Sequence, residues 1–174
     1  MPERTAFHGR REDLALLTKW VTTDGVRLVA ISGMGGIGKT TLAVELVERL
    51  RPGSFERVIW RSLVNAPPLE LVLNAWLQTM AGQSLDRPPE SIGQKLSLLF
   101  EELQRQRCLL ILDNLESIIE PGEQAGRFRA GYEEYGRLID RVGRTRHRSC
   151  LLLTTRDLPK GIRPLEEDSP RVRI

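Results

Sequence analysis

Hydrophobic positions along the chain fall into short continuous runs separated by longer stretches in which they recur at helical spacing. The continuous runs are rich in β-branched residues and leucine, which is typical of strands buried on both faces. We predict strands over residues 26–32, 57–63, 108–113 and 150–155.

Between the strands, apolar side chains recur every three or four positions, as on one face of a helix. Leu14, Leu17 and Val21 show this spacing near the N-terminus. Residues 116–128 are rich in Glu and Gly and are predicted to form a loop, and the proline-containing tail from Leu158 is assigned no element. We predict helices over residues 11–22, 39–50, 67–80, 88–105 and 132–142.

The alternation of strands and helices predicts an α/β fold, a three-layer sandwich with a mostly parallel sheet. The chain has 174 residues, of which 40% are hydrophobic and 28% charged, the balance of one globular domain. We expect residues 1–174 to form a single domain, with a helical lead-in over about 1–24 and a core over about 25–174.

Several broad classes of protein are disfavoured by the composition. No apolar run approaches the roughly 20 residues of a membrane-spanning helix, and the polar N-terminus has no signal core behind it. The cysteines, Cys108 and Cys150, are too few for a disulfide scaffold and each opens an apolar run, so we expect buried thiols. A cytoplasmic protein without a membrane partner is therefore predicted.

The charge balance alone does not indicate a nucleic-acid partner. The net charge is +3, from 26 basic and 23 acidic residues. Arg141, Arg144 and Arg148 would form a basic stripe if they lay on one helix, and such a stripe can bind phosphates. We interpret it as a solvated helix end whose cations favour the negative end of the helix dipole, and we expect no nucleic-acid partner.

A glycine-rich segment follows the first predicted strand and precedes a predicted helix. Residues 33–40 read Gly-Met-Gly-Gly-Ile-Gly-Lys-Thr and match G-x-x-x-x-G-K-[ST] at every defined position. Glycines let backbone N–H groups approach a phosphate chain closely, and the start of a helix adds unpaired N–H groups. The ammonium of Lys39 would bridge the β- and γ-phosphates, and the hydroxyl of Thr40 would bind Mg²⁺. The segment predicts a phosphate-binding loop.

A phosphate-binding loop needs a second group that holds the metal ion, and a carboxylate at the end of the third predicted strand can supply it. Asp113 ends the most apolar predicted strand, and ligands of doubly wound sheets bind at the carboxyl ends of strands. We predict that Asp113 binds Mg²⁺ together with Thr40. Many ATP hydrolases of this type carry an acid next, but here Asn114 follows, and an amide cannot accept the proton of water. Slow hydrolysis is expected, with Glu116 as the candidate base and Glu120 and Glu123 as neighbours that could substitute.

The fourth predicted strand ends with Thr154, Thr155 and Arg156. If this strand lies beside the first and third, these side chains face the γ-phosphate. A guanidinium at that point can detect a third phosphate through a charge-assisted, bidentate hydrogen bond. The alternative is an ordinary surface arginine after a strand.

Taken together, these segments resemble the NB-ARC nucleotide-binding domain of the STAND class of signal-transduction ATPases. Phe7-His8-Gly9-Arg10 looks like the family's short N-terminal motif, which implies that Phe7, Gly9 and Arg10 lie near the adenine and the phosphates. Leu109–Asp113 is similar to the Mg²⁺ strand and Leu152–Arg156 to the sensor segment. The loop is close to the family's form, which implies nucleotide contacts from Gly33, Met34, Gly35, Gly36, Ile37, Gly38, Lys39, Thr40 and Thr41.

The resemblance implies an ADP/ATP-binding switch in which nucleotide exchange controls homo-oligomerisation. The family's helical and winged-helix subdomains are not found before Ile174, so we expect a fragment of a larger protein with its own regulatory and sensor domains. The stretches Gly131–Gly136 and Arg146–Cys150 are similar to cyanobacterial members with C-terminal β-propeller repeats. Two alternatives stay open: a small-molecule phosphotransferase on the same loop, with residues 116–148 as a lid, and a non-catalytic oligomerisation module that retains ADP.

Overall fold

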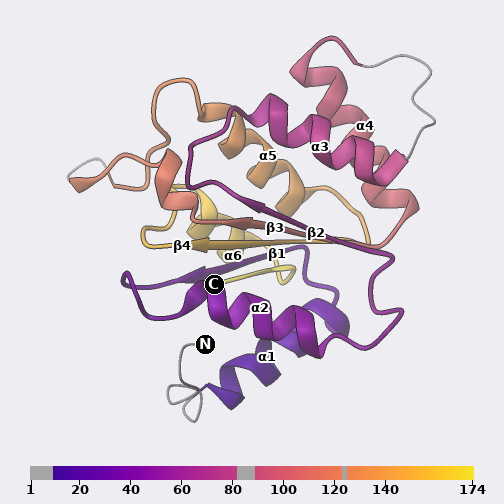
Figure 1. Ribbon diagram of the computed structural model, residues 1–174, viewed down its shortest axis with the longest axis vertical. Coiled ribbons are helices and arrows are strands. Elements are labelled where there is room, and N and C mark those ends of the chain that lie inside the picture. The colour runs from indigo at the N-terminus through magenta and orange to yellow at the C-terminus, as the bar shows by residue number, and fades with distance from the viewer. Residues whose placement is uncertain (1–9, 82–88, 123–124) are drawn as a thin grey trace.

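The computed structural model describes residues 10–81, 89–122 and 125–174. Within them, a five-stranded sheet has the order β2-β3-β4-β1-β5, and every neighbouring pair is parallel (Figure 1). The strands are β1 (Leu28–Ser32), β2 (Arg57–Ser62), β3 (Cys108–Asp113), β4 (Cys150–Thr155) and β5 (Val172–Arg173).

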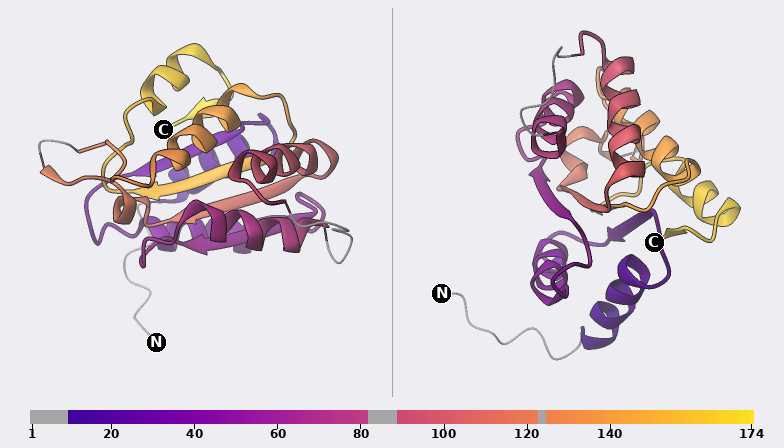
Figure 2. Two further views of the ribbon diagram at one scale, coloured as in Figure 1. Left: turned by 90° about the horizontal axis from the view of Figure 1, so that it is seen from above. Right: turned by 90° about the vertical axis from the view of Figure 1, so that its right-hand side faces the viewer.

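Helices cover both faces of this sheet, as Figures 1 and 2 show. α1 and α2 lie on one face, and α3, α4 and α5 lie on the other. The predicted three-layer α/β arrangement is confirmed. The helices are α1 (Arg11–Thr22), α2 (Lys39–Arg49), α3 (Leu69–Ala81), α4 (Ile92–Arg105), the 3-10 helix η1 (Leu115–Ile118), α5 (Glu133–Arg144) and α6 (Ile162–Asp168).

The central strands are apolar at successive positions because each face of the sheet has its own core. In β3, Leu110 and Leu112 pack with the helices α3 to α6, whereas Leu109 and Ile111 pack with α1 and α2. Side chains alternate between faces along a strand, so a continuous apolar run fills both cores at once. Cys108 and Cys150 are buried free thiols in these cores, as predicted.

The predicted elements are confirmed within a few residues, but the C-terminal tail differs from the expectation. Residues 162–168 form α6 and residues 172–173 form β5, where no element was assigned. Pro164 lies in the first turn of α6, where backbone N–H groups have no partner inside the helix, so it removes no hydrogen bond. Residues 115–118, at the start of the predicted loop, form η1.

The strand order determines where the functional side chains meet. β4 lies between β3 and β1, which is the condition that the interpretation of Arg156 required. The carboxyl ends of β1, β4 and β3 are therefore adjacent, with Ser32 paired to Thr155 in the register. None of the helices in the described part of the chain has the length and apolar character needed to span a membrane.

Candidate functional site

The glycine-rich loop connects the end of β1 to the start of α2. Gly36 and Gly38 have φ angles of 76° and 88°, in the left-handed region that favours glycine. Met34 and Ile37 point outward and are 80% and 50% exposed, so the loop is open to solvent rather than folded into the core. The loop therefore presents backbone and small side chains at the edge of the sheet.

Lys39 is the first residue of α2, and its side chain turns back over the loop. Its Nζ donates hydrogen bonds to the carbonyl oxygens of Gly33 at 2.7 Å and of Met34 at 3.0 Å. Lys39 is only 8% exposed. A buried cation held by neutral carbonyls, without a carboxylate within 4.0 Å in the described residues, is a ready partner for an anion.

The carboxylate of Asp113 faces the loop. Its Oδ1 accepts a hydrogen bond of 2.9 Å from the hydroxyl of Thr40. Asp113 is 4% exposed, because it ends a strand whose every residue is buried. Thr41, the next residue of α2, has an exposed side chain. The structure thus brings Thr40 and Asp113 together from positions 73 residues apart.

Thr154, which the sequence analysis places near the γ-phosphate but without a partner, is a third member of this cluster. Its hydroxyl donates to Oδ1 of Asp113 and accepts a 3.0 Å hydrogen bond from the backbone N–H of Asn114. The side-chain amide of Asn114 donates to Oδ2 of Asp113 at 3.0 Å. A threonine that is 1% exposed inside an apolar strand was the available signal, since a buried hydroxyl needs a partner.

Arg156 and Glu116 form an ion pair next to the loop. Nε of Arg156 lies 3.3 Å from Oε1 of Glu116, while Oε2 of Glu116 is buried and has no hydrogen-bond partner among the described residues. A Cβ built on Gly35 would lie 3.0 Å from Cζ of Arg156. The guanidinium therefore touches both the loop and the candidate base.

Arg10 lies on the helix side of the loop. Its Nη1 donates to the carbonyl oxygen of Gly38 at 3.1 Å, and its Nη2 donates to that of Ile37. The backbone of the loop is thus held from the segment that precedes α1. Phe7 and Gly9, which the resemblance implied as nucleotide contacts, lie outside the described residues, as does Glu123.

Two hollows adjoin the loop and share Ser32 in their linings. One has a volume of about 690 Å³ and lies between Gly33–Gly35 and the segment Arg156–Leu158. The other, of about 310 Å³, is mostly apolar and lies between α1 and the end of β1, with Leu17, Trp20 and Ile31 in its wall. A polar hollow beside an apolar one can accommodate a ligand with a charged and an apolar part.

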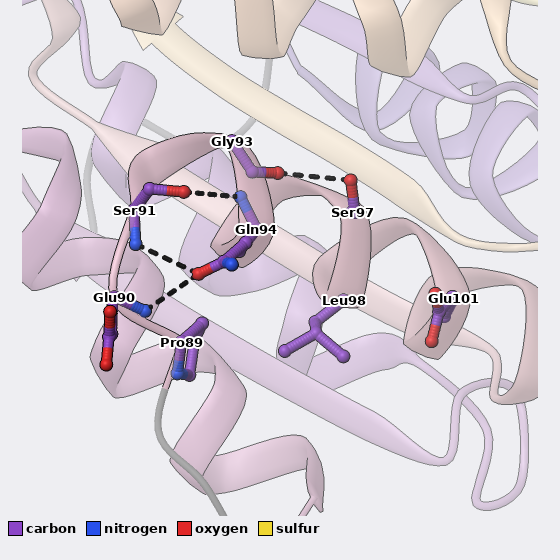
Figure 3. Close-up of a pocket in the computed structure, with 8 residues that line it drawn as sticks. All are labelled: Pro89, Glu90, Ser91, Gly93, Gln94, Ser97, Leu98 and Glu101. Carbon is purple, nitrogen blue, oxygen red and sulfur yellow. Dashed lines mark hydrogen bonds between the residues drawn. The ribbon is translucent and has the colours of Figure 1, made fainter.

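A larger hollow, of about 990 Å³, lies away from the loop at the start of α4 (Figure 3). Its hydrogen bonds form a capping box, in which Ser91 Oγ accepts from the N–H of Gln94 and Gln94 Oε1 accepts from the N–H of Ser91. Because these groups satisfy the helix end itself, they are not available to a ligand.

A family model for the NB-ARC domain matches residues 11–119. Among curated proteins, an uncharacterized WD repeat-containing protein of Nostoc sp. is 43% identical over 179 aligned residues, covering 99% of this chain. The regulatory protein AfsR of Streptomyces coelicolor is 34% identical over 64% of this chain, and the disease resistance protein SUMM2 of Arabidopsis thaliana is 27% identical over 66%. The chain spans only 14%, 12% and 13% of these relatives.

Solved structures share the fold at low sequence identity. Cdc6p of Pyrobaculum aerophilum superposes on 98% of this chain and 46% of its own with a TM-score of 0.66 and 19% identity. The ORC2 protein of Aeropyrum pernix covers 96% of this chain and 47% of its own with a TM-score of 0.58 and 18% identity. The family match over residues 11–119, together with this fold, shows that the chain belongs to the NB-ARC family of nucleotide-binding P-loop domains.

Proposed function

We propose that this chain is the nucleotide switch of a larger signalling protein: it binds ADP or ATP with Mg²⁺ and hydrolyses ATP slowly. The observation that carries the proposal is the 2.9 Å hydrogen bond between Thr40 and Asp113. A hydroxyl and a carboxylate meet beside the glycine-rich loop, and these are the oxygen groups with which P-loop proteins hold Mg²⁺.

Each residue has a distinct part in binding. The ammonium of Lys39, now held by the carbonyl oxygens of Gly33 and Met34, would turn to the phosphates that the loop binds. Thr40 and Asp113 would hold the cation, and Thr154 would keep the carboxylate in position. Mg²⁺, when bound, neutralises phosphate charge. The apolar hollow between α1 and β1 suits the adenine, in keeping with the family resemblance.

Slow hydrolysis follows from the residues after β3. Asn114 can orient a water molecule but cannot accept its proton, and its amide is already bonded to Asp113. The proton would have to pass to Glu116, whose Oε1 is paired with Arg156. We infer that Glu116 acts as a general base once Arg156 turns to a γ-phosphate, so turnover depends on breaking this pair.

The larger protein is proposed from the relatives. The Nostoc relative carries WD repeats by its name, and such repeats form β-propellers, so we propose C-terminal repeats that regulate this domain. The 174 residues would act as one domain in the cytoplasm, and exchange of ADP for ATP would permit homo-oligomerisation. A switch of this kind requires a ligand that binds the two states with different affinities.

Substitution of Lys39 by alanine tests the binding step. Isothermal titration with ADP and ATP in the presence of Mg²⁺ should show a loss of affinity of at least about 30-fold, since a charge-assisted contact to phosphate is removed. Lys19→Ala is the matched control, because Lys19 lies on the exposed face of α1 and its ion pair with Asp24 is long, at 4.0 Å. Unchanged affinity in Lys39→Ala would refute the assignment.

A turnover assay, read together with these titrations, separates the alternatives. Release of inorganic phosphate from ATP without an added acceptor supports a hydrolytic switch. Transfer of the phosphate to an added metabolite would instead support the phosphotransferase, with residues 116–148 in contact with the acceptor. Tight ADP binding with no turnover at all would support the non-catalytic module.

A further inference from the structure

A second group of cationic side chains lies at the opposite edge of the sheet from the phosphate loop. Arg27, Arg107 and Arg171 directly precede β1, β3 and β5, and Arg146 and Arg148 precede β4. Because all the strands are parallel, their amino ends share one edge and the loop lies at the other. Sequence segments up to 144 residues apart thus contribute guanidinium groups to one edge.

These five arginines line one concave hollow of about 340 Å³. The rest of its wall is Thr22 at the end of α1, Thr23 and Gly25 after it, and His147. No acidic side chain lines it. The volume lies at the lower end of the range of small-molecule sites, and the hollow is open to solvent.

The positive charge in this hollow is not neutralised by the protein. Among the described residues, none of the five guanidinium groups has a carboxylate within 4.0 Å, although other arginines such as Arg49, Arg137 and Arg144 do. Arginines usually find such partners when they cluster, because like charges at close range repel. The charge of these arginines is therefore available to an anion from outside the domain.

Neutral groups hold several of the arginines in place. Arg107 donates to the carbonyl oxygens of Val21 at 3.1 Å and Thr22 at 2.8 Å, and its guanidinium stacks on Phe55. Arg148 donates to the carbonyl oxygen of Arg105 at 3.1 Å. These contacts orient the side chains without cancelling their charge, so less conformational entropy is lost when a ligand binds.

The arginines are also crowded together. Burial, followed by the charges of Arg171 and Arg146, lowers the pKa of Arg27. Gly25 has a φ angle of 61°, and a Cβ there would lie 2.9 Å from Nη1 of Arg171. Arg171 also donates to the carbonyl oxygen of Asp24. A glycine at position 25 therefore leaves the room that the guanidinium occupies.

We propose that this hollow, which we call the arginine pocket, binds a compact anion that carries several phosphate groups. Five cations call for a high density of negative charge, and guanidinium groups bind phosphate oxygens in bidentate pairs. A phosphate chain brings one charge or more per group in little volume, whereas an acidic peptide needs about one residue for each charge. The site is separate from the nucleotide loop and would let a second phosphorylated ligand act on the domain.

The neighbouring hollow is also basic. It shares Thr22 and Thr23 with the arginine pocket and is lined by Lys19 and Arg49, which face Asp24 and Glu45, and by Arg11 and Arg51, for which no carboxylate lies within 4.0 Å among the described residues. Five guanidinium groups around one small hollow favour a compact anion, and a nucleic acid that followed the basic surface into the neighbouring hollow is the alternative that the experiment must separate.

Inorganic tripolyphosphate is the probe for this site. Isothermal titration in metal-free buffer is carried out on the Lys39→Ala chain, because the phosphate loop of the native chain would bind the same probe. It should show one tripolyphosphate bound per chain, with an affinity that falls as salt is raised. The double variant Arg146→Gln, Arg171→Gln should weaken binding by at least about tenfold, because two charge-assisted contacts are removed. Both side chains are exposed, so the fold should be retained, and the thermal unfolding midpoint checks this.

Two controls make the result specific. Arg49→Gln, Arg144→Gln removes the same charge from exposed, carboxylate-paired arginines outside the pocket and should change the affinity by less than about twofold. Both double variants are compared in the Lys39→Ala background, because the loop with Lys39 intact would bind the same probe. Equal weakening in both double variants, or no tripolyphosphate bound to the Lys39→Ala chain, would overturn the proposal. So would a short DNA duplex that binds more tightly than tripolyphosphate and depends on Arg146 and Arg171.

Discussion

Nε of Arg156 lies 3.3 Å from Oε1 of Glu116, and this ion pair joins the end of β4 to the 3-10 helix after β3. The side chain of Arg156 is 62% exposed, so water screens the pair and it adds little to stability. Breaking the ion pair therefore costs little free energy. A γ-phosphate, with more charge than a carboxylate, would compete well for the guanidinium, and Glu116 would then be released.

Arg156→Ala should reduce the ability of the domain to distinguish ATP from ADP. We expect ATP affinity to fall about tenfold while ADP affinity changes less than about twofold, because only ATP carries the third phosphate that the guanidinium would contact. Competition of both nucleotides against a fluorescent ADP analogue measures this. Arg137→Ala is the control, since Arg137 pairs with Glu134 on the surface of α5. An equal loss for both nucleotides would contradict a sensor role.

Glu116→Gln should lower the rate of ATP hydrolysis with little effect on nucleotide affinity. The amide has the same shape but cannot take a proton, so a general base would be lost and turnover should fall by about 100-fold. Phosphate release under single-turnover conditions gives the rate. Glu120→Gln is the comparison, because Glu120 is the other substitute base in the described residues. If Glu120→Gln lowers the rate of hydrolysis and Glu116→Gln does not, Glu120 is the general base and the assignment of Glu116 is wrong.

The local features could be predicted from the sequence because short-range physics determines them. The continuous apolar runs around Leu110 and Leu152 are typical of buried strands, and the glycines at 36 and 38 indicate a backbone with positive φ. The position of Asp113 at a strand end predicted that its carboxylate would face the loop. The hydrogen bond from Thr40 agrees with this expectation.

The long-range features could not be predicted, because they depend on strand order. The spacing of Arg141, Arg144 and Arg148 allows a stripe on one helix, but α5 ends at Arg144, and Arg148 instead joins arginines that precede other strands. The contact of Thr154 with Asp113 likewise requires β4 to lie beside β3. Periodicity cannot show which strands are neighbours, so these two clusters emerge only from the topology.

Thr154→Val tests whether the buried hydroxyl positions Asp113. Valine has a similar volume but leaves the carboxylate and the N–H of Asn114 without this partner, which should cost about 1–3 kcal/mol in the free energy of unfolding. The Mg²⁺ concentration needed for half-maximal nucleotide binding should also rise. Urea unfolding and a Mg²⁺ titration measure the two effects. Thr154→Ser, which keeps the hydroxyl, should restore both, and a failure to do so would indicate a packing role alone.

The buried thiols predict how stability depends on pH. Burial raises the pKa of Cys108 from 9.0 to about 11 and that of Cys150 from 9.0 to about 12. Between pH 9 and the folded pKa of each thiol, the folded chain keeps the thiol protonated, whereas the unfolded chain releases the proton. A folded pKa above the unfolded value means that the contribution is fully present below pH 9 and is lost as the pH rises.

Urea unfolding between pH 8 and 11 should therefore show a fall in the free energy of unfolding that begins near pH 9, with a slope of about 1.4 kcal/mol per pH unit for each thiol. Tyr135, whose pKa burial also raises, adds to the fall near the upper end of this range. Cys150→Ala isolates the thiol, since it should be less stable at pH 8 but lose less stability on going to pH 11. Native chain should also resist iodoacetamide at pH 8, because thiolate is the reactive form. If the free energy of unfolding fell equally with pH in the native chain and in Cys150→Ala, the thiol of Cys150 would be shown to ionise in the folded state. Rapid reaction of the folded native chain with iodoacetamide at pH 8 would lead to the same conclusion.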